Sequence, residues 1–487
     1  MTRFGSRIEL MTRLMKGLMM GLLLAGVPGR ATAFSLLGPY DTWQVTAIGY
    51  NIVEDIGGPM SPPEGYRWNI PVIHYAYDPS FVQYFGSVGM AEVDKAMKVF
   101  NDLPAFSSIS NDGSSLLING EPVPTDVRGP ANFGAGVAGL LDLKSYAMMI
   151  VSEELGLAQP ERWSWALRAR DTRTFNGELF TNYTVIVRNF DPITLAPSSY
   201  VNGVRYGFTI REPIRPPINY ADAVESSIDA VNPYPFSAVA SRDLGTGEYF
   251  IGLSHDDVGG LRFLYNANRL VAEQLLADVT GGISGAGVGS PWRGFLGITN
   301  TAILTNIFVV TNASGTNLIR AGLRPGINRL NFKRANYDSL LTSFFVPATN
   351  SYTDTVISNS RPVLQSVRRV VTQPDILFTC RDLGLIDNLF PVLYRRTFTS
   401  FWQNNDALNG IPGKAGPGVI IPRITIEFSS VLPYIILTDP ESTGNSDSLN
   451  SGVWGSFDEN SETPVIYPNF NPLTLRELQE QALQGGP

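Results

Sequence analysis

The sequence contains a single cysteine, Cys380, so no disulfide within the chain can hold the fold together. Exported eukaryotic proteins of this length usually carry several disulfides, and their absence here favours a bacterial origin. The fold must therefore depend on hydrophobic cores, and 487 residues are enough for two or three domains. Cys380 ends a strand-like run, DILFTC, and we expect it to be a small buried apolar side chain rather than a reactive thiol.

Residues 1–33 have the three-part order of a secretory signal peptide. Basic side chains precede an apolar run over residues 18–27, and Ala31 and Ala33 are the small side chains expected just before a cleavage point at Phe34. The run is shorter than the roughly 20 residues that span a bilayer. We therefore expect export to the periplasm, the cell surface or the medium, starting from Met1 or Met11. A buried hydrophobic helix is the alternative.

Charge and composition exclude several classes of partner. Removal of residues 1–33 takes away five basic residues and one acidic residue, which changes the net charge from −8 to −12. A chain this acidic is a poor partner for nucleic acid. No later segment has 18 consecutive uncharged apolar residues, so we expect no transmembrane segment. The high glycine and proline content predicts a protein rich in loops and strands.

Two periodicities alternate along the first half of the mature chain, which predicts an α+β domain over residues 34–280. The strand-like segments are residues 68–77 and 182–211, and the helix-like segments are residues 87–103, 140–157 and 256–276.

The second half has a different character. A Gly-rich segment over residues 281–291 is typical of a linker. Short strand-like runs at irregular spacing follow, and they predict a separate all-β, sandwich-like domain over residues 292–440. Residues 441–487 are polar and predict an extended tail.

The motifs of the common enzyme classes are missing. Only two histidines exist, His74 and His255, which argues against a His-based zinc site or a Ser-His-Asp triad. The sequence has no HExxH, CxxC, GxSxG or P-loop pattern. Residues 134–139 match GxGxxG, but the polar run before them, which contains Pro130, does not predict the strand that a dinucleotide site needs. We therefore expect no bound cofactor.

Three segments, in order, resemble a matrixin-type metzincin metallopeptidase. Residues 68–78 (WNIPVIHYAYD) and a helix ending near residues 99–104 (VFNDLP) resemble the first strand and helix of that fold. Residues 149–157 (MIVSEELGL) resemble its active-site helix, and residues 253–265 (LSHDDVGGLRFLY) its closing helix. The resemblance implies a metzincin-like scaffold over roughly the first half of the chain, with an insertion between the last two segments.

This sequence departs from the family pattern where the metal belongs. The resemblance places Glu153 and Leu157 on two zinc-binding histidines and Glu154 on the general-base glutamate. Leucine has no lone pair to donate, and zinc needs at least three good ligands and an open position. Glu154 is then the only catalytic candidate, and Glu153 and His255 are weak candidate metal ligands. The other interpretation of His255 is a partly exposed residue at a helix start, with Ser254 or the neighbouring aspartates as caps.

Three functions follow from these observations. The first is a non-catalytic structural or interaction protein that binds an unknown protein or polysaccharide surface. The second is a secreted matrixin-like metallopeptidase with a non-standard zinc site. The third is a carbohydrate- or surface-binding module with aromatic side chains as a stacking platform, and its candidates are Trp402, Tyr434, Trp454 and Tyr467.

Overall fold

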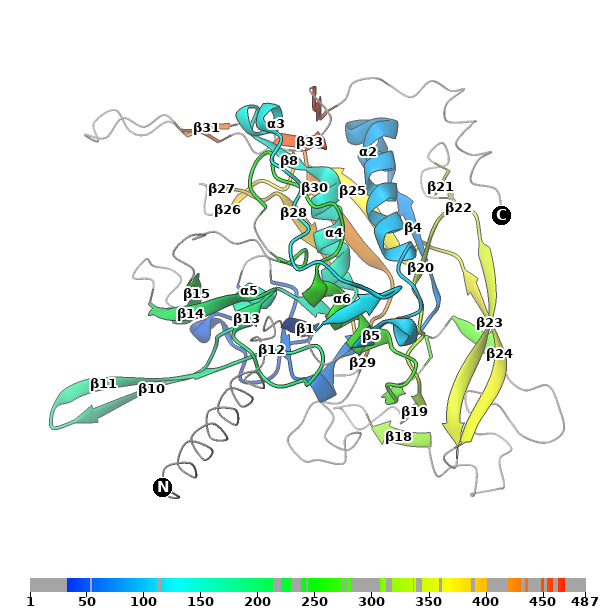
Figure 1. Ribbon diagram of the computed structural model, residues 1–487, viewed down its shortest axis with the longest axis horizontal. Helices are drawn as coiled ribbons and strands as arrows, with labels where there is room; N and C mark the ends of the chain where they lie inside the picture. Colours follow the sequence, from blue (N-terminus) through cyan, green and yellow to red (C-terminus); the bar gives the residue numbers. More distant parts are fainter. Residues whose placement is uncertain are drawn as a thin grey trace, which may run out of the picture.

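Figure 1 shows a computed structural model in which helices pack on several sheets and one hairpin projects outward. The structure describes residues 33–468 with gaps, the longest being residues 213–219, 229–237, 282–306, 401–417 and 437–447. The expected signal peptide lies outside the described residues except for Ala33, and the expected linker does so except for Gly281. Helices and strands are both abundant, which confirms the predicted α+β class.

The central sheet takes strands from both halves of the chain. Its order is β20-β4-β25-β30-β28, in which the first four strands are parallel and β28 is antiparallel to β30. Parallel strands are usually covered on both faces, and β4 and β25 are accordingly buried along most of their length. The bounds are β4 Val72–Tyr77, β20 Asn331–Arg334, β25 Ile376–Arg381, β28 Tyr394–Arg396 and β30 Ile424–Ser429.

Two helices build the core beside this sheet. Helix α2 (Pro79–Asn101) packs on β4, β20 and β25, and helix α4 (Leu143–Glu154) packs on α2. Helix α2 has a kink at Gly86, whose φ of 64° and ψ of −165° are not helical, and the helix predicted over residues 87–103 is the segment after this kink. A shorter helical segment precedes the kink, and Asp78 caps it by accepting a hydrogen bond from the Ser80 N–H at 2.9 Å. Proline at the first helical position suits this start.

A small sheet forms around the segment that follows the expected cleavage point. Strand β1 (Phe34–Gly38) pairs with β2 (Gly58–Met60), β9 (Leu157–Ala158) and β12 (Asn189–Phe190). Helix α6 (His255–Tyr265) packs on β1 and β9. The helix predicted over residues 256–276 is therefore confirmed in its first half and ends at Tyr265.

A long hairpin projects from the body (Figure 1). Strands β10 (Ala166–Phe175) and β11 (Glu178–Ile186) pair with each other and with no other described strand. Asn176 and Gly177 connect them with φ angles of 52° and 84°. Two residues with positive φ form the type of turn that matches the strand twist, and Asn-Gly is its preferred sequence.

A further sheet also spans the expected linker. Its order is β16-β19-β23-β24-β17, with β18 paired to β19. The bounds are β16 Val271–Glu273, β17 Val279–Gly281, β18 Ile307–Thr311, β19 Leu318–Arg324, β23 Ala348–Ser358 and β24 Arg361–Val371.

The predicted boundary at residues 281–291 does not separate two structural units. Both large sheets take strands from either side of it. One hydrophobic cluster joins Phe81 of α2, Phe332 of β20 and Phe428 of β30. The prediction of a separate all-β domain over residues 292–440 is therefore wrong. A strand pattern reports local periodicity and does not show which strands pair.

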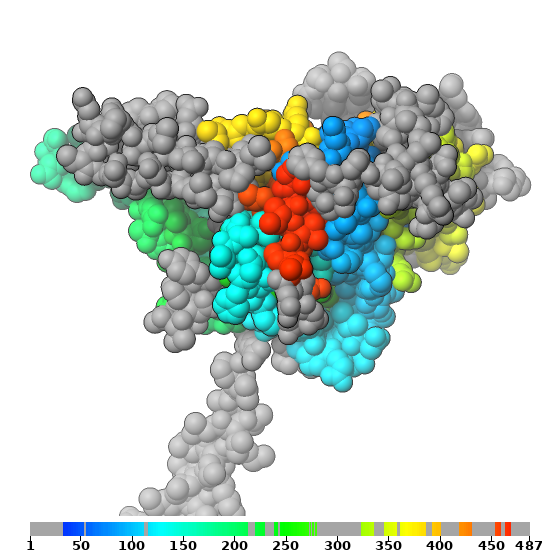
Figure 2. All heavy atoms as spheres, turned by 90° about the horizontal axis from the view of Figure 1, so that it is seen from above, coloured from blue at the N-terminus to red at the C-terminus, as the bar shows by residue number. Residues whose placement is uncertain are grey.

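Part of the predicted polar tail also belongs to the body. Strand β33 (Val453–Ser456) pairs in parallel with β8 (Leu140–Asp142), and Trp454 is 2% exposed. In Figure 2 this segment, in red, lies between the blue of α2 and a cyan segment of the same chain. The buried Trp454 and Tyr467 explain the attachment, because burying an aromatic side chain stabilises by roughly 1.5–3 kcal/mol.

The remaining elements are short, except for β14 and β15. They are η1 Thr46–Ile48, η2 Pro62–Glu64, β3 Tyr66–Arg67, η3 Phe106–Ser108, β5 Ser110–Asn111, β6 Leu116–Ile118, β7 Glu121–Pro122, α3 Phe133–Val137, α5 Pro160–Trp163, β13 Tyr200–Val201, β14 Val204–Arg211, β15 Asp222–Ser227, β21 Tyr337–Asp338, β22 Phe344–Phe345, β26 Leu385–Ile386, β27 Phe390–Pro391, β29 Gly418–Val419, β31 Tyr434–Ile436, β32 Ser448–Asn450 and β34 Val465–Ile466. Within the described residues, no helix combines the length and the apolar character needed to cross a bilayer.

Candidate functional site

Helix α4 ends at the acidic pair instead of continuing past it. The helix predicted over residues 140–157 runs from Leu143 to Glu154, and Leu157 lies in β9, paired with Leu36 of β1. Gly156 has a φ of 99°, and a Cβ atom there would clash with the Tyr66 carbonyl oxygen. An HExxH-type ligand pair requires two side chains four residues apart on the same face of a helix. Glu153 and Leu157 do not have this arrangement, because Leu157 lies outside the helix.

Glu153 is held by an arginine from the other half of the chain. The Arg396 Nε atom of β28 donates to Glu153 Oε2 at 2.6 Å, and both side chains are 4% exposed. Gln159 Nε2 donates to the other carboxylate oxygen at 3.2 Å. Burial lowers the pKa of Arg396, but the Glu153 carboxylate outweighs it and holds that pKa above its ordinary value. The two side chains therefore form a charged, buried ion pair.

Glu154 has the opposite character. It is fully buried, and among the described residues neither of its carboxyl oxygens has a hydrogen-bond partner. Burial raises the pKa of this carboxyl well above its usual range, and the Arg396 charge offsets only part of that effect. The surroundings of Glu154 therefore favour its neutral form, and a carboxyl buried away from water cannot take a proton from a solvent water as a general base does.

His255 is the first residue of α6, and both of its ring nitrogens face polar partners. It is 2% exposed, which corrects the partly exposed position considered above. The Nε2 atom accepts from the Leu116 N–H at 3.0 Å, so the proton lies on Nδ1, which is 3.4 Å from Asp256 Oδ1. A metal would have to displace the Leu116 hydrogen bond. The expected cap is confirmed, because the Ser254 side chain accepts from the Asp257 N–H.

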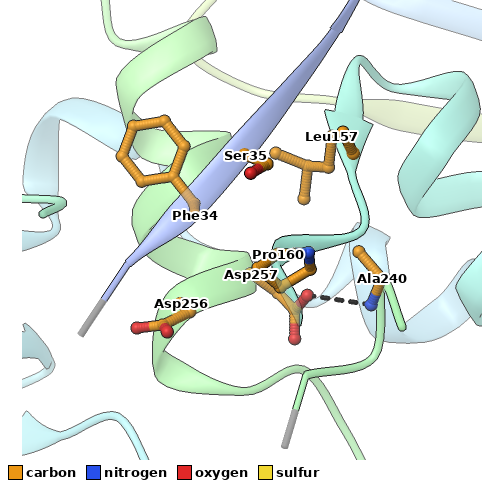
Figure 3. A pocket seen from close by; sticks show the side chains of 8 residues that line it. Phe34, Ser35, Leu157, Pro160, Ala240, Asp256 and Asp257 are labelled. Atoms are coloured by element: carbon orange, nitrogen blue, oxygen red, sulfur yellow. Dashed lines mark hydrogen bonds between the residues drawn. The ribbon is translucent and has the colours of Figure 1, made fainter. Parts of the chain in front are cut away.

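The two aspartates that follow His255 tie loops to the helix (Figure 3). Asp256 accepts from the Ala33 N–H at 2.8 Å and the Asn202 N–H at 2.6 Å. Asp257 accepts from the N–H groups of Val239 and Ala240 at 2.9 and 3.0 Å. Burial raises the pKa of Asp256 to about 6. The small cavity beside these carboxylates is lined largely by apolar side chains, including Phe34 and Leu157, and the aspartates act as structural anchors.

His74 and Cys380 lie in the central sheet. His74 is 2% exposed and bonds through Nε2 to the Asn350 amide at 2.7 Å, and burial lowers its pKa. Cys380 is buried as expected, and burial raises the pKa of its thiol to about 12. The part of the chain that the structure describes contains no group of three or more His, Cys, Asp or Glu side chains that could hold a metal ion.

The GxGxxG segment and the four aromatic residues are the remaining candidates from the sequence. The GxGxxG segment lies largely within the five-residue helix α3, and a loop precedes that helix, so the strand of a dinucleotide site is missing in front of it. Trp454 and Tyr467 are buried and cannot form a stacking platform. Trp402 and the side chain of Tyr434 lie outside the described residues.

No family model, curated protein or solved structure matches this chain. The resemblance to matrixins therefore stays a prediction, and the geometry around α4 carries the functional argument. Sequence reasoning found Glu153 and Glu154 but missed Arg396. The only available signal was the Arg395-Arg396 pair in a short strand, where adjacent side chains point to opposite faces and one of the two must face the protein.

Proposed function

We propose that this chain is an exported, non-catalytic protein of structural or interaction type, built on a protease-like α+β scaffold without a zinc site. The buried ion pair between Arg396 and Glu153 carries this proposal. The order of β4, α2, α4 and α6 along the chain supports a metzincin-like arrangement of the first half. The expected signal peptide supports export.

The ion pair argues against metal binding on electrostatic grounds. A zinc ion at Glu153 would lie beside a fixed guanidinium charge in a site from which water is excluded, where like charges repel strongly. Arg396 cannot leave without uncovering a buried carboxylate, a change that costs about 3–5 kcal/mol. Burial favours the neutral form of the Glu154 carboxyl, and a neutral carboxyl is a poor zinc ligand.

Metal content and peptidase activity test this proposal together. The protein lacking residues 1–33 would be equilibrated with zinc, dialysed and examined by elemental analysis, and casein digestion would be followed with and without a chelator. We expect well under about one zinc per chain and no chelator-sensitive cleavage. Glu153→Gln and His255→Ala are the matched variants, and neither should change the zinc content.

About one tightly held zinc per chain, lost in the Glu153→Gln or His255→Ala variant together with casein cleavage, would overturn the proposal in favour of a metallopeptidase with a non-standard site. Zinc that stays bound in both variants would place a metal outside these side chains and would also contradict the proposal.

A further inference from the structure

The hairpin of β10 and β11, which we call the arm, exposes large apolar side chains near its tip. Phe175 is 67%, Leu179 70% and Phe180 49% exposed. Phe175 and Phe180 lie on one face of the arm, and Leu179 lies on the other, because residues two apart on a strand share a face. An isolated two-stranded hairpin is marginally stable in water, so the outer arm needs a partner.

The two edges of the arm differ in charge. Strand β10 carries Arg168, Arg170, Asp171 and Arg173, and it contacts β15 near its base. Strand β11 (ELFTNYTVI) has nine residues, no proline and no lysine or arginine, and its single charge, Glu178, lies at the turn. Natural sheets usually protect an exposed edge with lysine, proline or a bulge. The β11 edge has none of these, and no described strand pairs with it.

We propose that the β11 edge pairs with the β11 edge of a second copy of this chain, antiparallel and about a two-fold axis near Thr181. This register places Leu179 of each copy opposite Tyr183 of the other, an aliphatic-aromatic pair of the kind that stabilises sheets. The two Glu178 carboxylates then lie at opposite ends of the new strand pair. A parallel pairing would bring them together.

The same residues argue against a lipid surface as the occupant. The tip of the arm is Asn176-Gly177-Glu178, and Thr181, Asn182 and Thr184 follow along β11. Insertion into hydrocarbon would bury these polar groups and leave the backbone edge unpaired, at a cost of several kcal/mol for each group. Pairing with an identical strand satisfies the backbone groups and packs Leu179 against the facing Tyr183 at the same time.

Sedimentation of the full chain lacking residues 1–33 tests the proposal. We expect a reversible monomer-dimer equilibrium between roughly 1 and 100 µM, because a single strand pair forms a small interface. Thr181→Lys places two lysines face to face and should raise the dimer Kd by about tenfold or more. Thr172→Lys is the matched control, because Thr172 is the direct partner of Thr181 on β10 and the change leaves the β11 edge intact.

Cross-linking gives a second readout of the same pairing. The Cα atoms of facing residues in an antiparallel strand pair lie about 4.5–5.5 Å apart, which is within the range that a disulfide can bridge. Cys380 is buried, so an added cysteine would be the only exposed thiol among the described residues. Thr181→Cys should form a covalent dimer under mild oxidation, because residue 181 faces itself across the two-fold axis. Thr172→Cys and Asn182→Cys should not, because residue 182 faces Phe180 of the other copy in this register.

Three results would overturn the proposal. The first is a monomer at every concentration with no cross-link at position 181. The second is a dimer that Thr181→Lys leaves unchanged, which would place the interface elsewhere. The third is a monomer that binds phosphatidylcholine or phosphatidylglycerol vesicles through the arm.

Discussion

Arg396 lies near two adjacent carboxyls that differ in their contacts. Glu153 forms the ion pair with Arg396, whereas neither carboxyl oxygen of Glu154 has a hydrogen-bond partner among the described residues and burial raises its pKa. Neighbouring positions on one helix point in different directions, so one acid reaches the guanidinium and the other enters the core. One arginine therefore separates the chemistry of two residues that look equivalent in the sequence.

At this scale we predict a strong coupling between Arg396 and Glu153. Arg396→Met should lower the free energy of unfolding by about 3–5 kcal/mol, because it leaves a buried carboxylate without its partner. The double variant Arg396→Met with Glu153→Gln should recover at least about half of that loss, because no charge is left buried. Chemical denaturation of the four proteins of this double-mutant cycle measures the coupling.

Arg395→Met is the control, because Arg395 is exposed and sits on the same strand. It should change the free energy of unfolding by less than about 0.5 kcal/mol. Equal effects of the two arginine variants, or no coupling in the cycle, would show that the ion pair does not hold the end of α4.

The end of α4 is set by backbone geometry. Gly156 adopts a left-handed conformation and turns the chain directly from the helix into β9, where Leu157 pairs with Leu36. A periodic apolar pattern continues through this point, so the sequence alone predicted a longer helix. The turn separates Glu153 from Leu157 and removes the helical spacing on which a zinc ligand pair depends.

A pair of glycine variants tests this turn. Gly177→Ala at the arm adds only the strain of a positive φ, because nothing lies within 4 Å of the new methyl group, and should cost about 1–2 kcal/mol. Gly156→Ala has similar strain and also a clash with the Tyr66 backbone, and should cost roughly 3 kcal/mol or more. Thermal unfolding measures both, and equal losses would contradict the packing described for Gly156.

On the scale of the whole molecule, strand pairing joins the two halves of the chain. Strand β4 lies between β20 and β25, which come from beyond residue 306. Asp94 of α2 makes a further connection, because it accepts hydrogen bonds from Tyr75 and Tyr77 of β4 at 2.7 Å and from Arg334 of β20 at 3.0 Å. A core shared in this way does not divide at the Gly-rich segment.

We therefore predict that fragments 34–280 and 292–487 do not fold separately. Each should lack a cooperative thermal transition by circular dichroism, because fragment 34–280 exposes both edges of β4 and fragment 292–487 lacks its central strand. Co-expression of the two fragments should restore a soluble complex with such a transition. A cooperative transition of fragment 34–280 alone would contradict the shared sheet.

Much of the local structure was predictable from the sequence. The strand at residues 72–77, the second part of helix α2, the start of α6 and the strand ending near Cys380 follow from periodicity and, at α6, from the Ser254 cap. The acidic pair at the end of α4 was also found. These features depend on residues within a few positions of each other, which a single sequence contains in full.

Long-range contacts decided the rest. The Arg396 side chain reaches Glu153 across 243 positions, and β4 pairs with strands more than 250 residues away. The buried Trp454 attaches part of residues 441–487 to the core, although the polar composition of that segment predicted an extended tail. The sequence by itself determined which segments become helices or strands, because backbone preference and side-chain periodicity are local. Only the tertiary structure decided which strands are neighbours and which charges meet, because those depend on the packing of the whole chain.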